Sequence, residues 1–244
     1  MIKPNVGVVI GHFDQPDFLE LNIRLIREHC GLCPILIADD CSDGSEPTPK
    51  PYSVAGRLLQ FAQLGAQVHL WPNAQRIGHA GGDLSAFWKG IIWARHHRID
   101  VLAKLSQRLL IDIPDWLDDW AAKLIESNLA VAGRGCSAHG WKVRTEAMLL
   151  RVEAWYQPGI LAHFTPRRID TPTEHVVWDA IQQSFGGEML DWSILSPARP
   201  QPVPGIYFRE ANTAADYAIV ARRFGLVSSF ETREHKHLPR YNLG

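Results

Sequence analysis

The chain has 244 residues, enough for one large α/β domain or two small ones. Its formal net charge of −1 provides no overall basic field to attract nucleic acid or an anionic membrane. No apolar run approaches the ~20 residues that span a bilayer, and the amino-terminal stretch lacks the features of a signal peptide. We therefore expect a cytoplasmic protein, with peripheral attachment at the inner membrane face as a second option.

Strand and helix patterns alternate along the first 135 residues. Short apolar runs predict strands, and apolar residues three or four positions apart predict helices. The expected strands are Val6–Ile10, Ile35–Ala38, Gln67–Leu70, one strand within Val101–Ile111, and Leu129–Ala132. The expected helices run from Pro16 to Gly31, from Val54 to Leu64, through Leu84 to Arg95, and from Pro114 with Leu117, Trp120, Ala121, Leu124 and Ile125 inside.

This alternation predicts an α/β fold with a mostly parallel, Rossmann-like sheet flanked by helices. The second half of the chain is less regular. Helical patterns there cover residues 172–185 and 212–224. In sheets of this kind, ligands bind beyond the carboxyl ends of the strands.

Two adjacent carboxylates, Asp39 and Asp40, follow the buried strand at 35–38. At the end of a parallel strand they are placed to meet a ligand. The alternative is that both aspartates organise the turn that follows through side-chain hydrogen bonds to its backbone.

The segments "VGVVIGHFDQPDFLELNIRLI" and "PILIADDCSDG" together resemble the amino-terminal signature of family 2 glycosyltransferases, which have the GT-A fold. Here Cys41 stands where the family usually has Gly, and the turn is one residue shorter. The loop from Asn73 to Gly82 and the late segment "TEHVVWDAIQQSFGG" extend the resemblance more weakly.

The resemblance implies a single GT-A-like domain over residues 1–244. Residues 1–135 would form the nucleotide-sugar donor half and residues 136–244 the acceptor half. The implied reaction transfers a sugar from a nucleoside-diphosphate sugar, with a UDP-sugar favoured, to a hydroxyl of a saccharide or lipid-linked acceptor. The pathway would be polysaccharide or glycoconjugate synthesis.

The resemblance also implies roles on the donor side. Asp40 would face the nucleobase and Asp39 would support it. In "RIGHAGGD", Arg76 could contact phosphate or nucleobase, and the loop from Gly78 could approach the diphosphate. Asp83, at the end of this segment, is expected to be a helix N-cap.

The family's metal-binding aspartates correspond here to Ser106, Gln107 and Arg108, which are poor ligands for Mg²⁺ or Mn²⁺. We therefore expect activity to depend little on divalent metal, with Lys104 or Arg108 as the counter-charge to the diphosphate. In one alternative, Asp83 or His237 holds a metal. In another, the protein is a catalytically inactive GT-A-like protein that binds a nucleotide or carbohydrate.

Glu174 and His175 correspond to the family's late acidic pair, whose second member acts as a base on the acceptor hydroxyl. His175 could take that role, oriented by Asp179 one turn later. The alternative for Glu174 is structural, because Thr171-Pro172-Thr173-Glu174 matches a capping box with Pro at the first helical position.

Three remaining groups of residues have weaker interpretations. Cys30 and Cys33 could bind zinc with Cys41 and His29, or be small buried thiols. Trp141 and Trp192 are candidate acceptor-site residues, whereas the tryptophans on helical stripes are expected in the core. His235 and His237 could reach the donor phosphate.

Overall fold

The computed structural model of the chain describes residues 3–41, 67–136, 143–192, 203–208 and 212–226. The predicted helix at 54–64, Trp141, His235 and His237 lie outside these ranges.

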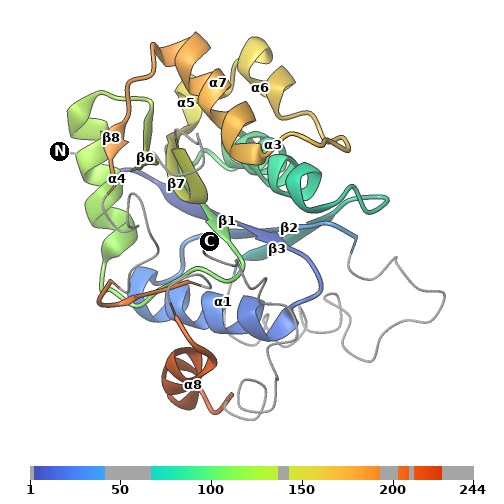
Figure 1. Cartoon of the computed structure of the whole chain (residues 1–244). Coiled ribbons are helices and arrows are strands. Elements are labelled where there is room, and N and C mark those ends of the chain that lie inside the picture. The colour runs from blue at the N-terminus through green and yellow to red at the C-terminus, as the bar shows by residue number, and fades with distance from the viewer. Residues whose placement is uncertain (1–2, 42–66, 137–142, 193–202, 209–211, 227–244) are drawn as a thin grey trace, which may run out of the picture.

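A seven-stranded sheet forms the centre of the described structure (Figure 1). In spatial order its strands are β3 (Val68–Pro72), β2 (Ile35–Asp39), β1 (Val6–His12), β4 (Val101–Ser106), β7 (Val143–Arg151), β6 (Val131–Gly135) and β8 (Leu190–Asp191). The neighbours β3, β2, β1 and β4 are parallel, and so are β6 and β8. Only β7 runs against its neighbours in this sheet. The prediction of a mostly parallel α/β sheet is confirmed.

Helices cover both faces of the sheet (Figure 1). They are α1 (Pro16–Cys30), α3 (His79–His96), α4 (Trp116–Ser127), α5 (Val152–Trp155), α6 (Pro158–His163), α7 (Thr173–Phe185) and α8 (Ala214–Arg222). Buried residues of α1 and α4 form one core with one face of the sheet, and those of α3, α6 and α7 form a second core with the other face. In the described part of the chain, no helix has the length and apolar character needed to cross a bilayer.

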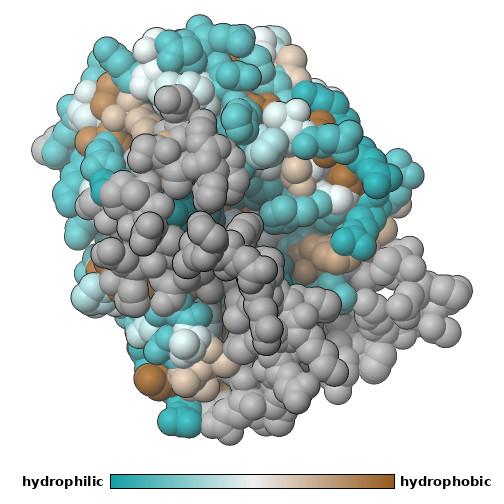
Figure 2. Space-filling view, in the orientation of Figure 1, coloured by the Kyte–Doolittle hydropathy of each residue, from teal (hydrophilic) through white to brown (hydrophobic). Residues whose placement is uncertain are grey.

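A smaller unit lies on the outer side of α1. Strands β5 (Leu110–Ile111) and β9 (Ile206–Tyr207) pair antiparallel, and α8 packs on Leu21 and Leu25 of α1. In the view of Figure 1, the described surface is mostly hydrophilic, and its hydrophobic residues form small separate patches (Figure 2).

Local sequence explains where α1 begins and ends. Pro16 occupies the first turn, where its missing N–H costs no helical hydrogen bond. Gly31 ends the helix with a φ of +60°, a region that favours glycine. Leu19, Ile23 and Ile26 are buried against the sheet, as their helical spacing predicts.

Several local predictions were wrong. Ile125 of α4 is 40% exposed, because the buried stripe consists of Leu117, Ala121 and Leu124. Helix α7 begins at Thr173, Pro172 is its N-cap, and no side-chain hydrogen bond caps it, so the capping box does not form. Trp192 is not an acceptor-site residue, since it is 1% exposed and stacks on Trp116 in the core.

The tryptophans on helical stripes behave as predicted. Trp93 and Trp116 are buried. Trp88, Trp120 and Trp178 are partly buried and pack against the two cores. The core prediction is therefore confirmed for these five residues.

Replacing Gly90 with Ala should destabilise the protein by about 1–3 kcal/mol, the usual cost of overpacking. A Cβ atom at Gly90 would lie 2.7 Å from Cγ1 of Val9, so α3 rests directly on β1 at this point. Gly159→Ala in α6 is the matched control, because its Cβ would meet no atom within 4 Å. Urea unfolding measures both variants. Equal stability of the two would contradict this close approach of helix and sheet.

Candidate active site

The register of the parallel strands brings their carboxyl ends to one edge of the sheet. His12 of β1 pairs with Asp39 of β2, and Asp39 pairs with Pro72 of β3. Gly11 of β1 pairs with Ser106, the last residue of β4. Ligands bind at this edge in open α/β sheets. Asp39 and Ser106, both predicted to lie at strand ends, are therefore at the edge where a ligand is expected.

Asp39 is tied to a histidine that the sequence analysis missed. Its Oδ1 lies 2.7 Å from Nδ1 of His12, and both side chains are buried. The hydrogen bond joins the ends of two neighbouring strands. The only signal in the sequence was a polar residue directly after Gly11 at the end of a buried run.

Asp40 organises the loop that leads into α3. Its Oδ1 accepts hydrogen bonds from the Asn73 side-chain amide at 2.9 Å and from the Ile77 N–H at 3.0 Å. Its Oδ2 accepts one from the Gly78 N–H at 3.1 Å. Gly82 must be small, because a Cβ there would lie 3.0 Å from Cγ of Asp40.

These contacts give Asp40 partners that neither expectation named, while residues 42–44 of the following turn lie outside the described residues. The residue is 5% exposed, and both of its carboxylate oxygens accept hydrogen bonds from within the chain. These partners belong to the loop at 73–78, which is far along the chain from the turn after Asp40. Gly78 has a φ of +87°, which favours glycine, and is the N-cap of α3.

A buried lysine lies behind the two aspartates. Lys89 of α3 is 2% exposed, and its Nζ donates to the carbonyl oxygen of Trp71 at 2.7 Å. Burial lowers the pKa of Lys89 to about 8, although Asp39 and Asp40 act in the opposite direction. Its positive charge offsets part of the repulsion between the adjacent carboxylates.

Arg76 packs on Phe13, the residue that directly follows β1. Its guanidinium carbon is 4.0 Å from the centre of the Phe13 ring, and the residue is exposed. The Phe13 backbone is held by Gln107, whose Oε1 accepts from the Phe13 N–H at 2.9 Å and whose Nε2 donates to the Phe13 carbonyl at 3.1 Å. The Arg76 guanidinium therefore packs on the ring of Phe13, whose backbone is held in place by Gln107.

The segment at the end of β4 is a turn, and its residues face neighbouring elements. The strand ends at Ser106, so Gln107 and Arg108 belong to the turn that follows it. Nε of Arg108 donates to Oε1 of Gln15, and the guanidinium carbon lies 5.9 Å from the centre of the Phe18 ring. Arg108 is half-buried beside the amino-terminal end of α1.

A second group of charges lies deeper, between the sheet and α3 and α7. Lys104 of β4 forms an ion pair with Asp83 of α3, and its Nζ donates to the Thr145 carbonyl at 2.7 Å. The Thr145 hydroxyl donates to Oε1 of Glu174 at 3.3 Å. The prediction that Asp83 is an N-cap was wrong, because α3 begins four residues earlier at His79.

Glu174 is held in its protonated form more strongly than an ordinary carboxyl. Burial raises its pKa, and the carboxylates of Asp83 and Glu146 raise it further. Lys104 and the backbone N–H of Glu174 itself act in the opposite direction. A carboxyl whose pKa is shifted toward neutrality is suited to accept a proton from a hydroxyl group.

His175 and Asp179 lie on the exposed side of α7. In the described part of the chain, no hydrogen bond joins them. Glu174, by contrast, points toward the sheet and contacts Thr145 of β7. Of the three residues predicted for catalysis, Glu174 is the one that lies with the buried charges.

The cysteines do not form the zinc site considered above. Cys30 and Cys33 lie at the amino edge of the sheet, and Cys41 follows the other end of β2, on the order of 20 Å away by strand length. His29 pairs instead with Asp112, with 2.7 Å between Nε2 and Oδ1. All four cysteines lie among the described residues, and none of them forms a disulfide.

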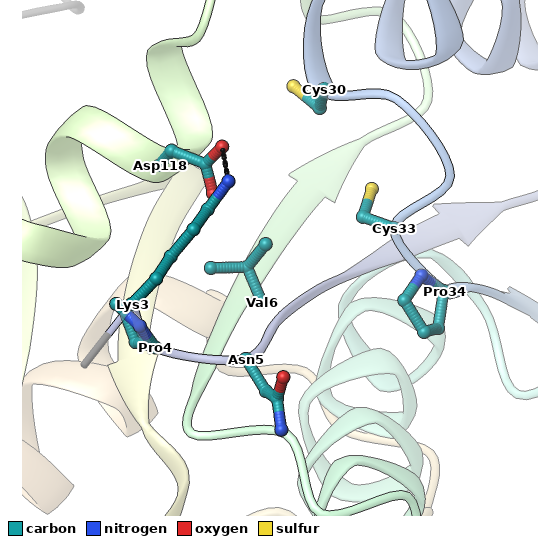
Figure 3. Close-up of a pocket in the computed structure, with 8 residues that line it drawn as sticks. All are labelled: Lys3, Pro4, Asn5, Val6, Cys30, Cys33, Pro34 and Asp118. Atoms are coloured by element: carbon teal, nitrogen blue, oxygen red, sulfur yellow. Dashed lines mark ion pairs between the residues drawn. The ribbon is translucent and has the colours of Figure 1, made fainter.

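A cavity of about 350 Å³ opens beside Cys30 and Cys33 (Figure 3). Lys3 crosses it to pair with Asp118, with 2.7 Å between Nζ and Oδ2. Burial raises the pKa of Cys30 to about 12 and that of Cys33 to about 11, so neither thiol is a ready nucleophile. The charged groups suited to chemistry converge at the opposite edge, where we place the candidate active site.

No family model and no curated protein matches the sequence. Solved structures match the fold. The mannosyltransferase PcManGT from Pyrobaculum calidifontis, solved with GDP-Man and Mn²⁺, has a TM-score of 0.56 and 13% identity over 98% of this chain. TarS of S. aureus, residues 1–349, has a TM-score of 0.55 and 10% identity over 91% of this chain. GalNAc-T7, solved with UDP, GalNAc and Mn²⁺, has a TM-score of 0.53 and 12% identity over 90%.

The present chain covers 67%, 65% and 48% of those three chains, respectively. At such identities the likeness is one of fold. The chain has the GT-A-like α/β fold of glycosyltransferase structures that hold nucleotides or nucleotide sugars.

Proposed function

We propose that the chain is a glycosyltransferase that moves a sugar from a nucleoside-diphosphate sugar to an acceptor hydroxyl. The observation that carries this proposal is Glu174, a carboxyl of raised pKa among buried charges beside the carboxyl edge of a GT-A-like sheet. The favoured donor is a UDP-sugar. The favoured acceptor is a saccharide or a lipid-linked molecule, and the proposed location is the cytoplasm. Family 2 is the glycosyltransferase family we propose, because "ADDCSDG" at residues 38–44 resembles its amino-terminal signature.

The donor side of the proposal uses the strand-end residues. Asp39 and Asp40 shape the nucleobase pocket, with Asp40 acting through the loop at 73–78 that it holds. The Gly78 end of that loop approaches the diphosphate, and Arg76 and Arg108 supply positive charge. Arginine suits this task because its planar fork of donors matches phosphate oxygens.

The two Mn²⁺-containing structures raise the question of a metal site here. The turn after β4 offers a hydroxyl, an amide and a guanidinium, and the amide of Gln107 is already bonded to the Phe13 backbone. Hard divalent cations prefer carboxylate oxygens, which this turn lacks. The described residues at this turn do not fit Mg²⁺ or Mn²⁺. In our proposal the arginines, in place of a metal ion, stabilise the negative charge of the leaving diphosphate.

The acceptor side of the proposal centres on Glu174 as the base. The proton of the acceptor hydroxyl moves to the Glu174 carboxylate as the oxygen forms its bond to the anomeric carbon. The bond from that carbon to the diphosphate breaks, and its electron pair leaves with the nucleoside diphosphate. His175, with Asp179 beside it on α7, is the second candidate for the base.

Nucleotide binding is the first test of this proposal. A nucleoside diphosphate or its sugar at about 100 times its dissociation constant should add roughly 2.7 kcal/mol to stability, measured as a thermal shift. The shift should persist in EDTA. Arg108→Met should weaken binding by about 1.5–3 kcal/mol, the range for hydrogen bonds to charged groups. Arg95→Met, at the far end of α3, is the control. No shift with any of the nucleotides or nucleotide sugars would contradict the proposal, and a shift abolished by EDTA and restored by Mn²⁺ would contradict metal independence.

Turnover tests the assignment of the base. Glu174→Gln should lower turnover about 100-fold or more while donor affinity stays intact, because a general base contributes on this scale. In the unmodified protein, turnover should fall as the pH drops through the pKa of Glu174. Retained turnover in Glu174→Gln with loss in His175→Ala would move the role to His175. Binding without turnover for every donor and acceptor tried would favour the rival, a binding protein, which the missing carboxylates after β4 also suggest.

A further inference from the structure

Lys104 is an unusual residue for the middle of a central strand. It is 0% exposed within the run "VLAKLS" of β4. Its ammonium group contacts the Asp83 carboxylate and the Thr145 carbonyl, and lies 5.0 Å from the centre of the Phe87 ring. A buried ammonium needs such partners, because burying an unpaired charge costs several kcal/mol.

The ion pair is joined to Glu174 through one residue. The Thr145 backbone accepts from Lys104, and the Thr145 hydroxyl donates to Oε1 of Glu174. The charged groups acting on Glu174 come from three elements: Asp83 of α3, Lys104 of β4 and Glu146 of β7. Glu146 is itself paired with Arg144, with 2.6 Å between Nη2 and Oε1.

The position of Asp83 places this group beside the proposed donor site. A Cβ atom on Gly11 of β1 would lie 3.7 Å from Oδ1 of Asp83. Gly11 pairs with Ser106 at the end of β4, two residues after Lys104. The ion pair therefore lies close to the ends of β1 and β4, and Thr145 links it to Glu174.

We propose that the Asp83–Lys104 ion pair is a positioning element for Glu174, acting through Thr145 and through the opposite charges of the two side chains. Lys104 fixes the start of β7, so that the Thr145 hydroxyl orients the Glu174 carboxyl. Asp83 favours the protonated carboxyl and Lys104 favours the carboxylate, so the pair balances the two states of the base. This inference rests on the proposed function only where it gives the protonation of Glu174 a role in catalysis. The contacts themselves do not depend on it.

Titration of the Glu174 carboxyl carbon by ¹³C NMR tests this proposal without any substrate. Lys104→Met should raise the pKa of Glu174 and Asp83→Asn should lower it, because an opposite and a like charge act with opposite signs. A pair that is only structural would give shifts of the same direction, or none. Asp179→Asn on the exposed side of α7 is the control and should cause no shift.

Thr145 provides a second route if the charge variants fail to fold. Thr145→Val removes the hydroxyl donor at nearly constant shape and should raise the pKa of Glu174, whereas Thr145→Ser keeps the donor and should restore it. An unchanged pKa in Thr145→Val would overturn the proposal. Because this experiment reads Glu174 directly, its failure differs from failure of nucleotide binding, which would instead remove the proposed function.

Discussion

Asp83→Asn is expected to lower the free energy of unfolding by about 3–5 kcal/mol, the cost of removing one partner of a buried ion pair. The partner left behind is Lys104, whose side chain is 0% exposed, whereas that of Asp83 is 15% exposed. The ammonium would then keep only neutral acceptors, the amide oxygen of the new side chain and the Thr145 carbonyl, with no opposite charge beside it. Urea unfolding followed by circular dichroism measures the loss.

A double variant separates the charge from the shape. Asp83→Leu combined with Lys104→Met replaces the ion pair by apolar side chains, an exchange that is often neutral or stabilising. The double variant should therefore be more stable than Asp83→Asn. Asp179→Asn is the exposed control and should stay within about 0.5 kcal/mol of the unmodified protein. A double variant that is less stable than the single one would contradict the assignment of the cost to an unpaired Lys104.

Asp40→Asn is expected to destabilise the protein by about 2–3 kcal/mol and to weaken nucleotide binding as well. The carboxylate accepts hydrogen bonds from Asn73, Ile77 and Gly78. An asparagine would replace one of its two accepting oxygens with an NH₂ group, so a donor would face a donor at that position. The loss of a hydrogen bond to a charged acceptor and the burial of an unpaired donor each lower the free energy of unfolding by an amount of this order. The loop from Asn73 to Gly78 would then lose its fixed shape.

Hydrogen exchange and calorimetry together test this account of Asp40. Faster exchange should be concentrated in residues 73–78, and the affinity for a nucleoside diphosphate should fall. Asp119→Asn, an identical change at an exposed position of α4, should alter neither stability by more than about 0.5 kcal/mol nor affinity. Weaker binding with unchanged exchange in the loop would instead favour direct contact of Asp40 with the nucleobase.

The sequence was sufficient for elements whose signals are local. Apolar runs and helical spacing located β1, α1, β2 and α3, because the residues that define each element are neighbours in the chain. Strand β7 was missed, since its sequence "VRTEAMLLR" carries Arg144 and Glu146 near its start. These two charges pair with each other, so they are compatible with a largely buried strand.

The candidate site was less accessible from sequence because its contacts are long-range. Asp40 bonds to residues 33 to 38 positions later, and Lys104 reaches Asp83 21 positions earlier. Local rules gave Asp83 the role of an N-cap, and they placed Trp192 in an irregular region that could face an acceptor. In the fold, both residues contact partners that are distant in the chain. Asp83 pairs with Lys104, and Trp192 stacks on Trp116.

The reversed strand β7 also constrains the order in which the sheet can assemble. It lies between β4 and β6, although both of those strands precede it in the chain. During synthesis β6 therefore has no place in the sheet until residues 143–151 arrive, and β4 presents an open edge able to pair with another chain. A fragment that ends before β7 would keep that edge exposed, so residues 1–135 cannot complete the sheet by themselves.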